Sequence, residues 1–294
     1  MKPAPFAYEA PATLDEAVGL LARYGDEAKV LAGGQSLAPL LAFRLAAPTV
    51  LIDLNGVREL EHAHLDGDTL VLGALTRHRT VEQMAELRTR CRMLAEGVSL
   101  IGHVAIRNRG TVGGSLAHAD PAAEWPSLVL ALDGEIDATG PTGTRTIPAA
   151  GFFESYFTTT LAADEIVREV RLHLPDGGRT GSTYVELARR HGDFALAGVG
   201  ALLSLGGDGT ISDARVVLIG VRDRAVRSAA AEAILRGSAP SEELFAEAAE
   251  AIDGEIDPVS DIHGSSDFRR HLAKVLVRRA LGRARDRAEQ GAPA

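Results

Sequence analysis

The chain has 294 residues, more than one hydrophobic core usually needs, and its 46% hydrophobic and 24% charged residues are typical of a globular protein. The formal charge of −9 argues against a nucleic-acid binder, because such proteins need a basic face that displaces counterions. Cys91 is the only cysteine, so this chain by itself can form no intrachain disulfide, iron–sulfur cluster or thiolate zinc site.

Residues 1–55 are predicted to form a small lobe of alternating helices and strands. Thr13–Glu16 has the pattern of a capping box, and apolar residues follow at helical spacing until Gly25, where the helix is expected to end. A buried strand at Lys29–Ala32 runs into two glycines, a helix begins near Ser36, and a second strand covers Thr49–Leu54. This order is typical of a βαβ unit.

Residues 56–176 are predicted to form a second lobe of mixed helices and strands. Its helices are expected after a cap at Thr80–Gln83, from Arg90 to Ile101, and over Pro121–Leu132. A second glycine-rich turn, Gly110–Ser115, precedes the last of these helices. Strands are expected at Glu135–Thr139, Thr144–Ile147, Glu165–Leu174 and, at the start of the lobe, Thr69–Leu75.

Pro175–Gly178 is the strongest candidate for a domain boundary, which divides the chain into residues 1–176, residues 177–287 and a tail at 288–294. Beyond it, the pattern predicts three strands and then three helices, at about 182–189, 196–205, 211–221, 225–235, 241–253 and 266–285. Gly206–Gly209 is a hairpin signal between the last two strands. We therefore expect a C-terminal α+β domain with a three-stranded antiparallel sheet.

Two glycine-rich segments are similar to each other: Leu31–Leu37 (LAGGQSL) and Gly110–Leu116 (GTVGGSL). Because glycine permits positive φ and has no Cβ, consecutive backbone N–H groups can converge on an anionic oxygen there. A helix that starts directly afterwards adds its N-terminal dipole. Neither segment has Lys or Arg in its core, so a diphosphate would be bound by amides and by the hydroxyls of Ser36, Thr111 and Ser115.

A single segment of this kind is more often an ordinary tight turn at the end of a strand. Two matched segments in separate α/β units favour a large ligand that lies between them. Neither segment fits the dinucleotide pattern G-x-G-x-x-G, and neither carries the lysine of a P-loop. The sequence therefore argues against Rossmann and Walker-type binding.

Three motifs in this order, AGGQSL, AIRNRGTVGGSLAHADPAAEWP and ELARRHGDFALAGV, resemble the FAD-binding medium subunits of the molybdenum hydroxylases. That family includes the flavoprotein subunits of aerobic carbon monoxide dehydrogenase and of xanthine dehydrogenase-type enzymes. The resemblance covers nearly the whole chain. It implies an α+β protein with a two-lobed FAD-binding domain of the PCMH type, followed by the C-terminal domain described above.

The resemblance also implies which residues contact the cofactor. These are Val30, Leu31, Ala32, Gly33, Gly34, Gln35, Ser36 and Leu37 in the first diphosphate loop, Thr111, Val112, Gly113, Gly114 and Ser115 in the second, and Ile101, Asp120, Glu124, Leu161 and Phe194 around the flavin. Within the second loop, Gly114 is a candidate for a backbone conformation that only glycine tolerates.

Two of these positions keep alternative interpretations. A carboxylate such as Asp120 would repel a diphosphate, so its partner would be a ribose or ribityl hydroxyl. The same residue, followed by Pro121, also fits a helix N-cap, and both roles can hold together. Phe194 fits core packing as well as it fits stacking on the flavin.

We expect FAD to be bound noncovalently. Flavoproteins of this general fold that bind FAD covalently use His or Cys near the first loop, whereas Gln35 stands here, and a primary amide is not nucleophilic. No metal site is expected in this chain. The [2Fe-2S] clusters and the molybdenum cofactor that the resemblance implies would lie on partner subunits.

The resemblance implies an electron-transfer subunit, which receives electrons from [2Fe-2S] clusters and passes them through FAD to an external acceptor. Its partners would be a small [2Fe-2S] subunit and a large molybdenum subunit, in a dimer of heterotrimers. The alternatives are a self-contained flavin oxidase or dehydrogenase and a non-catalytic nucleotide-binding module. The N-terminus has no apolar leader and no window is apolar enough to span a membrane, so a cytoplasmic location is expected.

Overall fold

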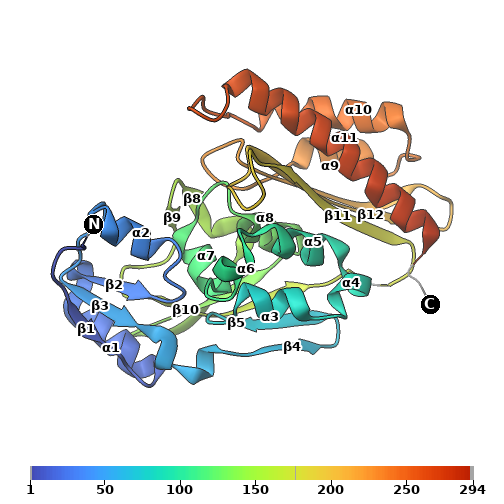
Figure 1. The fold of residues 1–294 in the computed structure, drawn as a ribbon. Helices are drawn as coiled ribbons and strands as arrows, with labels where there is room; N and C mark the ends of the chain where they lie inside the picture. The colour runs from blue at the N-terminus through green and yellow to red at the C-terminus, as the bar shows by residue number, and fades with distance from the viewer. Residues whose placement is uncertain (1, 176, 292–294) are drawn as a thin grey trace.

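The computed structural model describes residues 2–175 and 177–291, and the N-terminal lobe carries a three-stranded parallel sheet in the order β1-β3-β2 (Figure 1). Its elements are β1 (Ala7–Glu9), α1 (Leu14–Tyr24), β2 (Ala28–Leu31), α2 (Leu37–Ala42) and β3 (Val50–Asp53). The predicted βαβ unit is present as β2-α2-β3. The Thr13 hydroxyl accepts a hydrogen bond from the Glu16 amide, and α1 ends at Gly25 with φ 52°.

The second lobe is built on a five-stranded antiparallel sheet in the order β4-β5-β10-β6-β7. Its strands are β4 (Ala63–Asp66), β5 (Thr69–Gly73), β6 (Glu135–Gly140), β7 (Gly143–Pro148) and β10 (Ile166–His173). Its helices are α3 (His78–Gln83), α4 (Leu87–Arg90), α5 (Arg92–Leu100), α6 (Val104–Arg107), α7 (Val112–His118) and α8 (Glu124–Ala131). A small hairpin, β8 (Phe153–Ser155) and β9 (Thr158–Thr159), precedes β10.

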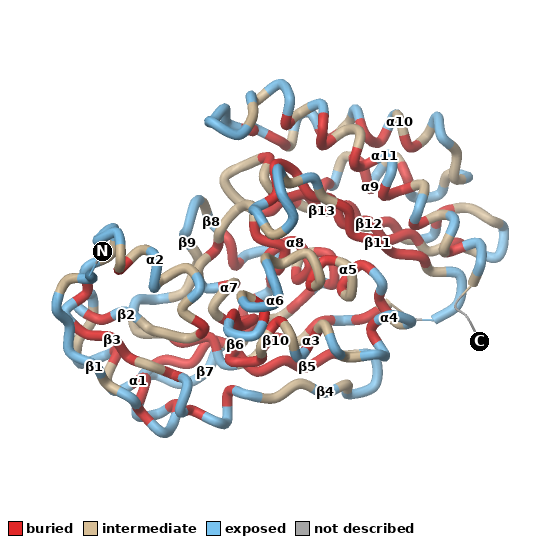
Figure 2. Tube along the Cα trace, viewed as in Figure 1, coloured by how far each residue is buried: buried red, intermediate tan, exposed pale blue. Residues whose placement is uncertain are grey.

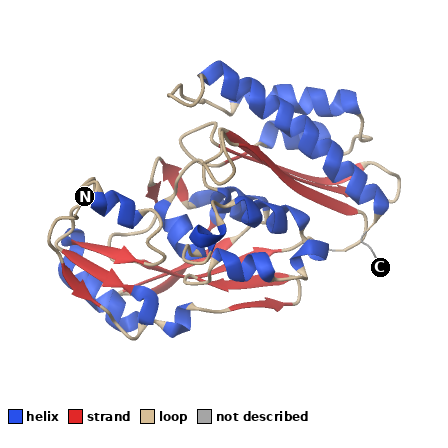
Figure 3. Cartoon of the chain, in the orientation of Figure 1, coloured by secondary structure: helices blue, strands red, loops and turns tan. Residues whose placement is uncertain are grey.

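The C-terminal part has a four-stranded antiparallel sheet, where three strands were predicted (Figure 3). Its elements are β11 (Thr180–Leu187), β12 (Ala197–Leu205), β13 (Ile211–Ile219), β14 (Val226–Arg227), α9 (Ala229–Leu235), α10 (Glu242–Ala251) and α11 (Ser266–Gln290). The extra strand, β14, has only two residues, so no alternating pattern marks it, and it lies in the segment that was predicted to start the first helix.

Several boundaries also differ from the prediction. The helix expected to be capped at Thr80 begins two residues earlier, at His78, and the helix expected from Pro121 begins at Glu124. Helix α11 continues to Gln290, so part of the predicted tail is helical, and residues 292–294 and the boundary residue 176 lie outside the described part of the chain. None of the described helices is both long and apolar enough to cross a bilayer.

The C-terminal sheet is buried on both faces (Figure 2). On its inner face, Tyr184, Val217 and Ile219 share one buried cluster with Trp125 and Leu128 of α8. On its outer face, strand residues pack against helices α9 to α11 in a separate cluster. The two predicted domains therefore share one hydrophobic core across their junction, with α5 and α8 lying between two sheets (Figure 1).

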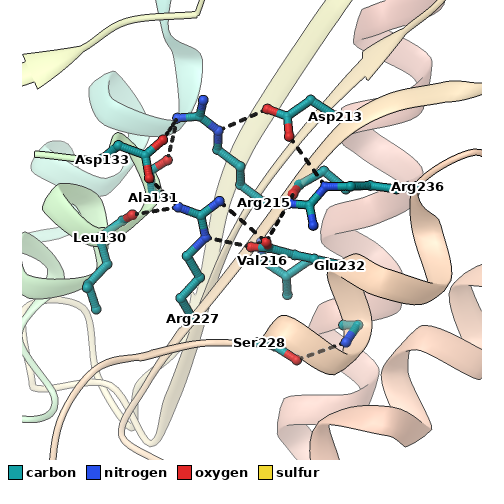
Figure 4. A network of polar contacts seen from close by, with 12 residues as sticks. Leu130, Ala131, Asp133, Asp213, Arg215, Val216, Arg227, Ser228, Glu232 and Arg236 are labelled. Carbon is teal, nitrogen blue, oxygen red and sulfur yellow. Dashed lines mark hydrogen bonds and ion pairs between the residues drawn. The ribbon is translucent and has the colours of Figure 1, made fainter. Parts of the chain in front are cut away.

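Polar contacts reinforce this junction at the C-terminal end of α8 (Figure 4). Arg215 donates to the Ala131 carbonyl at 2.9 Å, Arg227 donates to the Leu130 carbonyl at 3.4 Å, and both guanidinium groups pair with Asp133. The last carbonyls of a helix have no partner within it and carry partial negative charge, so cations are favoured there. Two strands of the C-terminal sheet thus cap a helix of the first domain.

Candidate cofactor-binding site

The two glycine-rich segments, which stand far apart in the sequence, lie against each other in the structure. A Cβ placed on Gly33 would lie 2.3 Å from the Arg109 carbonyl oxygen and 2.8 Å from the Gly110 Cα. A Cβ on Gly114 would lie 3.6 Å from the Cβ of Ala32. Backbone therefore packs directly on backbone, and Gly33 is required because there is no room for a side chain.

The first segment (Ala32–Ser36) presents unpaired backbone amides. Gly34 has φ 72°, which favours glycine, and the Gln35 side-chain amide donates to the Gly33 carbonyl at 3.0 Å. Within the described chain, none of the five amides from Gly33 to Leu37 donates to a protein acceptor. Consecutive free amides at the start of a helix form an anion-binding concavity, so this segment fits the diphosphate of FAD.

The second segment is helical, where a turn was predicted. Thr111 is the N-cap of α7, and Gly113 and Gly114 lie in its first turn without positive φ, so the expectation of a glycine-only conformation at Gly114 is wrong. Its amides are already paired: Val112 with the Thr76 carbonyl, Gly113 with the Ala74 carbonyl, and Gly114 with the Thr111 hydroxyl. Gly113 is needed for close packing, because its Cβ would lie 2.6 Å from the Cβ of Ala74.

Helix α7 is about 10 Å long, since its seven residues rise by about 1.5 Å each, so its C-terminal end lies about 10 Å from its start at Val112. The helix ends at Ala119, whose carbonyl accepts a hydrogen bond from the Phe157 amide of the β8–β9 hairpin at 3.3 Å. The Gly220 amide of the C-terminal domain donates to the Pro121 carbonyl at 2.9 Å. Three separate segments therefore meet around this end of α7.

The turn Gly192–Ala195 closes the same region from the C-terminal domain. Gly192 has φ 90° and packs on the His103 ring, to which a Cβ would come within 2.4 Å. His103 is two residues beyond Ile101, which is half-buried at the end of α5. Phe194 is 61% exposed, so the core-packing interpretation of this residue is wrong. Phe194 and Asp120 both line one cavity of about 510 Å³ between the domains.

The two predicted carboxylates occupy different environments. Asp120 is not a helix N-cap, since α8 starts four residues later; its Oδ1 accepts from the Ala122 amide at 2.9 Å, and burial raises its pKa. Glu124 is only 6% exposed and does not line the cavity. Burial first, and then the charge of Glu186, raise the pKa of Glu124 to about 8. Burial also raises the pKa of Glu186 to about 7.

These buried carboxyls make stability depend on pH. Because the pKa of Glu124 is raised from 4.5 to about 8, the folded chain keeps a proton that the unfolded chain releases. Its contribution is fully present below about pH 4 and is lost as the pH rises towards 8, by up to ~1.4 kcal/mol per pH unit. We expect Glu124→Gln to reduce the loss of stability between about pH 5.5 and pH 8.5, measured by urea unfolding of the ligand-free protein.

The matched control is Glu247→Gln, an exposed glutamate of α10, which should leave the pH dependence of the free energy of unfolding unchanged. If the free energy of unfolding falls by the same amount in Glu124→Gln and in the unmodified chain between about pH 5.5 and pH 8.5, Glu124 does not hold a proton in the folded state.

Three residues that lie against the two glycine-rich segments escaped the sequence analysis. Asn55 donates from Nδ2 to the Ala32 carbonyl at 2.9 Å, and its Oδ1 accepts from Arg77, which also donates to the Arg109 carbonyl. His78, next to Arg77, accepts a hydrogen bond from Trp125 Nε1 at 2.9 Å, and burial lowers its pKa to about 3. The sequence signal that could have pointed to Asn55 and Arg77 is their position, because each follows closely after a buried strand.

The described residues contain no group of three or more His, Cys, Asp or Glu side chains arranged for a metal ion. The remaining predicted residues lie near the two loops or the cavity. Val30 and Leu31 end β2, Leu37 starts α2, Ser36 precedes that helix without a capping hydrogen bond, and Ser115 lies in α7. Leu161 is half-buried just after β9, and its amide donates to the Thr159 hydroxyl at 3.3 Å.

Paired glycine-rich segments on two α/β lobes, joined to a sheet-and-helix domain, fit a flavoprotein subunit. Two family models agree: the FAD binding domain in molybdopterin dehydrogenase matches residues 4–175, and the CO dehydrogenase flavoprotein C-terminal domain matches residues 182–284. The chain belongs to this family of FAD-binding subunits of molybdenum hydroxylases, and it is a subunit of an oxidoreductase.

Individual relatives match along the whole chain. The carbon monoxide dehydrogenase medium chain of Hydrogenophaga pseudoflava is 37% identical over 97% of this chain and 98% of its own. The 6-hydroxypseudooxynicotine dehydrogenase complex subunit alpha of Paenarthrobacter nicotinovorans is 40% identical over 98% and 97%. A solved structure of the Hydrogenophaga pseudoflava carbon monoxide dehydrogenase superposes with a TM-score of 0.94 at 39% identity, covering 98% of this chain and 99% of that chain.

Proposed function

We propose that this chain holds FAD noncovalently and carries electrons from [2Fe-2S] clusters on a small partner subunit to an external acceptor. A large partner subunit would hold the molybdenum cofactor, in a dimer of heterotrimers located in the cytoplasm. The observation that carries the proposal is the run of unpaired amides from Gly33 to Leu37, held against the second glycine-rich segment. The protein has a net charge of −9, so a diphosphate needs such local donors.

The diphosphate would bind near the N-terminal end of α7, and the flavin ring near its C-terminal end. The first segment would donate its backbone amides to the diphosphate. The amides of the second segment are already paired, so this segment would pack against the diphosphate and contribute the hydroxyl of Ser115. Ile101, Leu161 and Phe194 would contact the flavin ring, and Asp120 a hydroxyl of the ribityl chain. FAD supplies the redox chemistry when bound, while the protein sets its position and access.

The noncovalent mode is supported by Gln35, whose amide is not a nucleophile and already donates to the Gly33 carbonyl. The partner subunits are supported by relatives named as a medium chain and as a complex subunit. Cys91, the only cysteine, is buried, and burial raises its pKa to about 11, so it offers no cluster ligand at the surface.

The test is co-expression of this chain with the neighbouring open reading frames, followed by size exclusion, metal analysis and acid precipitation. We expect a yellow complex with iron and molybdenum in the same peak, and FAD released intact into the acid supernatant. Flavin that stays with the precipitated chain would contradict noncovalent binding, and FMN in place of FAD would contradict the diphosphate site. A chain that elutes alone and reduces its flavin with a small organic substrate would be a self-contained dehydrogenase.

A further inference from the structure

The two glycine-rich segments are joined by a short chain of side-chain hydrogen bonds that lies outside both of them. Asn55 Nδ2 donates to the Ala32 carbonyl of the first segment at 2.9 Å. Arg77 Nη2 donates to Asn55 Oδ1 at 2.7 Å, and Arg77 Nη1 donates to the Arg109 carbonyl, directly before the second segment. We call Asn55 and Arg77 the loop clamp. It connects the Ala32 carbonyl, which precedes Gly33, to the Arg109 carbonyl, against which Gly33 packs.

The loop clamp fixes the direction of backbone amides that themselves touch no protein acceptor. A trans peptide is planar, so its N–H points away from its C=O. Asn55 holds the Ala32 carbonyl, which aims the Gly33 amide to the opposite side. Gln35 holds the Gly33 carbonyl in the same way and aims the Gly34 amide. Both amides belong to the unpaired run in the first segment.

Asn55 is anchored outside the glycine-rich segments, and Arg77 is anchored through its backbone to the second segment. Asp53, at the end of β3, accepts from the Asn55 amide at 2.9 Å, and it also accepts from the Tyr8 hydroxyl. The backbone of Arg77 forms a bridge with Thr111, the N-cap of α7. The clamp therefore ties β3 of the first lobe to the start of α7 in the second, and it adds a permanent positive charge to segments that contain none.

We propose that Asn55 and Arg77 are positioning residues for the diphosphate of FAD, which hold the amides of the first segment ready for it and keep the two segments at one spacing. The proposal rests on the proposed function. Preorganised donors strengthen binding because the ligand does not have to order them. The clamp should therefore affect ligands that contain the diphosphate and leave flavins that lack it unaffected.

The experiment compares ligand affinity in the full chain after removal of bound flavin. FAD, ADP and riboflavin are titrated into the original protein and into Asn55→Ala, Asn55→Asp, Arg77→Gln and Arg77→Lys. We expect FAD and ADP to bind roughly 3- to 10-fold more weakly to Asn55→Ala and roughly 10- to 100-fold more weakly to Arg77→Gln. Asn55→Asp has the same shape but cannot donate to Ala32, and its carboxylate would face that of Asp53, so FAD and ADP affinity should fall at least as far as in Asn55→Ala. Arg77→Lys keeps the charge and should restore part of the affinity.

Arg58→Gln is the control, because Arg58 is an exposed arginine of the same lobe with no hydrogen bond to either segment. The affinity of Arg58→Gln for FAD should equal that of the original protein. An effect as large as that of Arg77→Gln would mean that the loss of a positive charge, and not the loss of the hydrogen bonds of the loop clamp, weakens binding. Riboflavin affinity and the ligand-free melting temperature report on structure alone. If these fall together with FAD affinity in Asn55→Ala, the clamp is structural and the proposal is wrong. Unchanged FAD affinity in every variant would also overturn it, whereas an original protein that binds no FAD would overturn the proposed function instead.

Discussion

Replacing Gly33 by valine should yield a folded protein that contains no FAD. The Cβ of the new side chain would lie 2.3 Å from the Arg109 carbonyl oxygen, and ordinary contact begins at 3.4 Å, so the two glycine-rich segments would have to separate by about 1 Å. That separation breaks the spacing on which both segments depend, and crowding of this kind costs about 1–3 kcal/mol of stability. The measurement is the ratio of flavin to protein absorbance after purification, together with the melting temperature.

Two other glycines provide graded controls for this prediction. Gly34→Ala introduces a side chain at φ 72°, with a backbone penalty of about 1–2 kcal/mol but no clash with backbone, so FAD should bind with reduced affinity. In Gly114→Ala the new Cβ would crowd the Thr111 hydroxyl, at 2.7 Å, and make an ordinary contact with Ala32 Cβ, at 3.6 Å, so this variant should have the mildest effect. A Gly33→Val protein with a normal flavin content would show that the contact between the segments does not matter for the cofactor.

Replacing Gly181 by valine should destabilise the whole chain. Gly181 lies on β11 under α11, and a Cβ there would lie 2.0 Å from the Ala284 carbonyl oxygen and 2.5 Å from the Ala288 amide nitrogen. Neither backbone atom can move without shifting the helix. We expect a loss of about 3 kcal/mol or more, which lowers the melting temperature by roughly 6–12 °C in a chain of this size.

The control is Gly19→Ala, an exposed glycine in the middle of α1 that has no atom within 4 Å of an added Cβ. Alanine favours a helix by up to about 1 kcal/mol over glycine, so this variant should melt at a slightly higher temperature. The two glycine substitutions therefore have expected effects of opposite sign. Thermal unfolding followed by circular dichroism measures both, and a Gly181→Val protein as stable as the original would mean that α11 is not packed as described.

Much of the fold was predictable from local pattern, because long periodic segments carry a strong signal. Helix α1, the βαβ unit and strands β11 to β13 are all present close to their predicted bounds. Most of the elements that were not predicted are between two and four residues long, namely β1, β4, α4, α6, the β8–β9 hairpin and β14, whereas α7, with seven residues, was predicted as a turn. Such segments are determined by the partner they pair with, and a pairing over a long sequence separation leaves no periodicity to detect.

The candidate site was predictable in its residue types but not in its geometry. Sequence similarity between the two glycine-rich segments suggested equal roles, yet the structure shows free amides in the first and paired amides in the second. The difference arises because strand β5 continues into Ala74 and Thr76, whose carbonyls take the amides of Gly113 and Val112. Asn55 and Arg77 were missed because a position after a buried strand is a weak signal, and their importance depends on contacts between separate lobes.

The C-terminal sheet packs against helices of both domains, so cutting the chain between the domains should not separate them. If a protease cut the chain just before β11, the inner faces of β11 and β13 would still be covered by α5 and α8. We therefore expect the nicked protein to remain one particle in size exclusion. Produced separately, each half would expose an apolar surface and tend to aggregate. The two halves should therefore evolve together. Replacing one half by the corresponding half of a distant relative should disrupt the shared core.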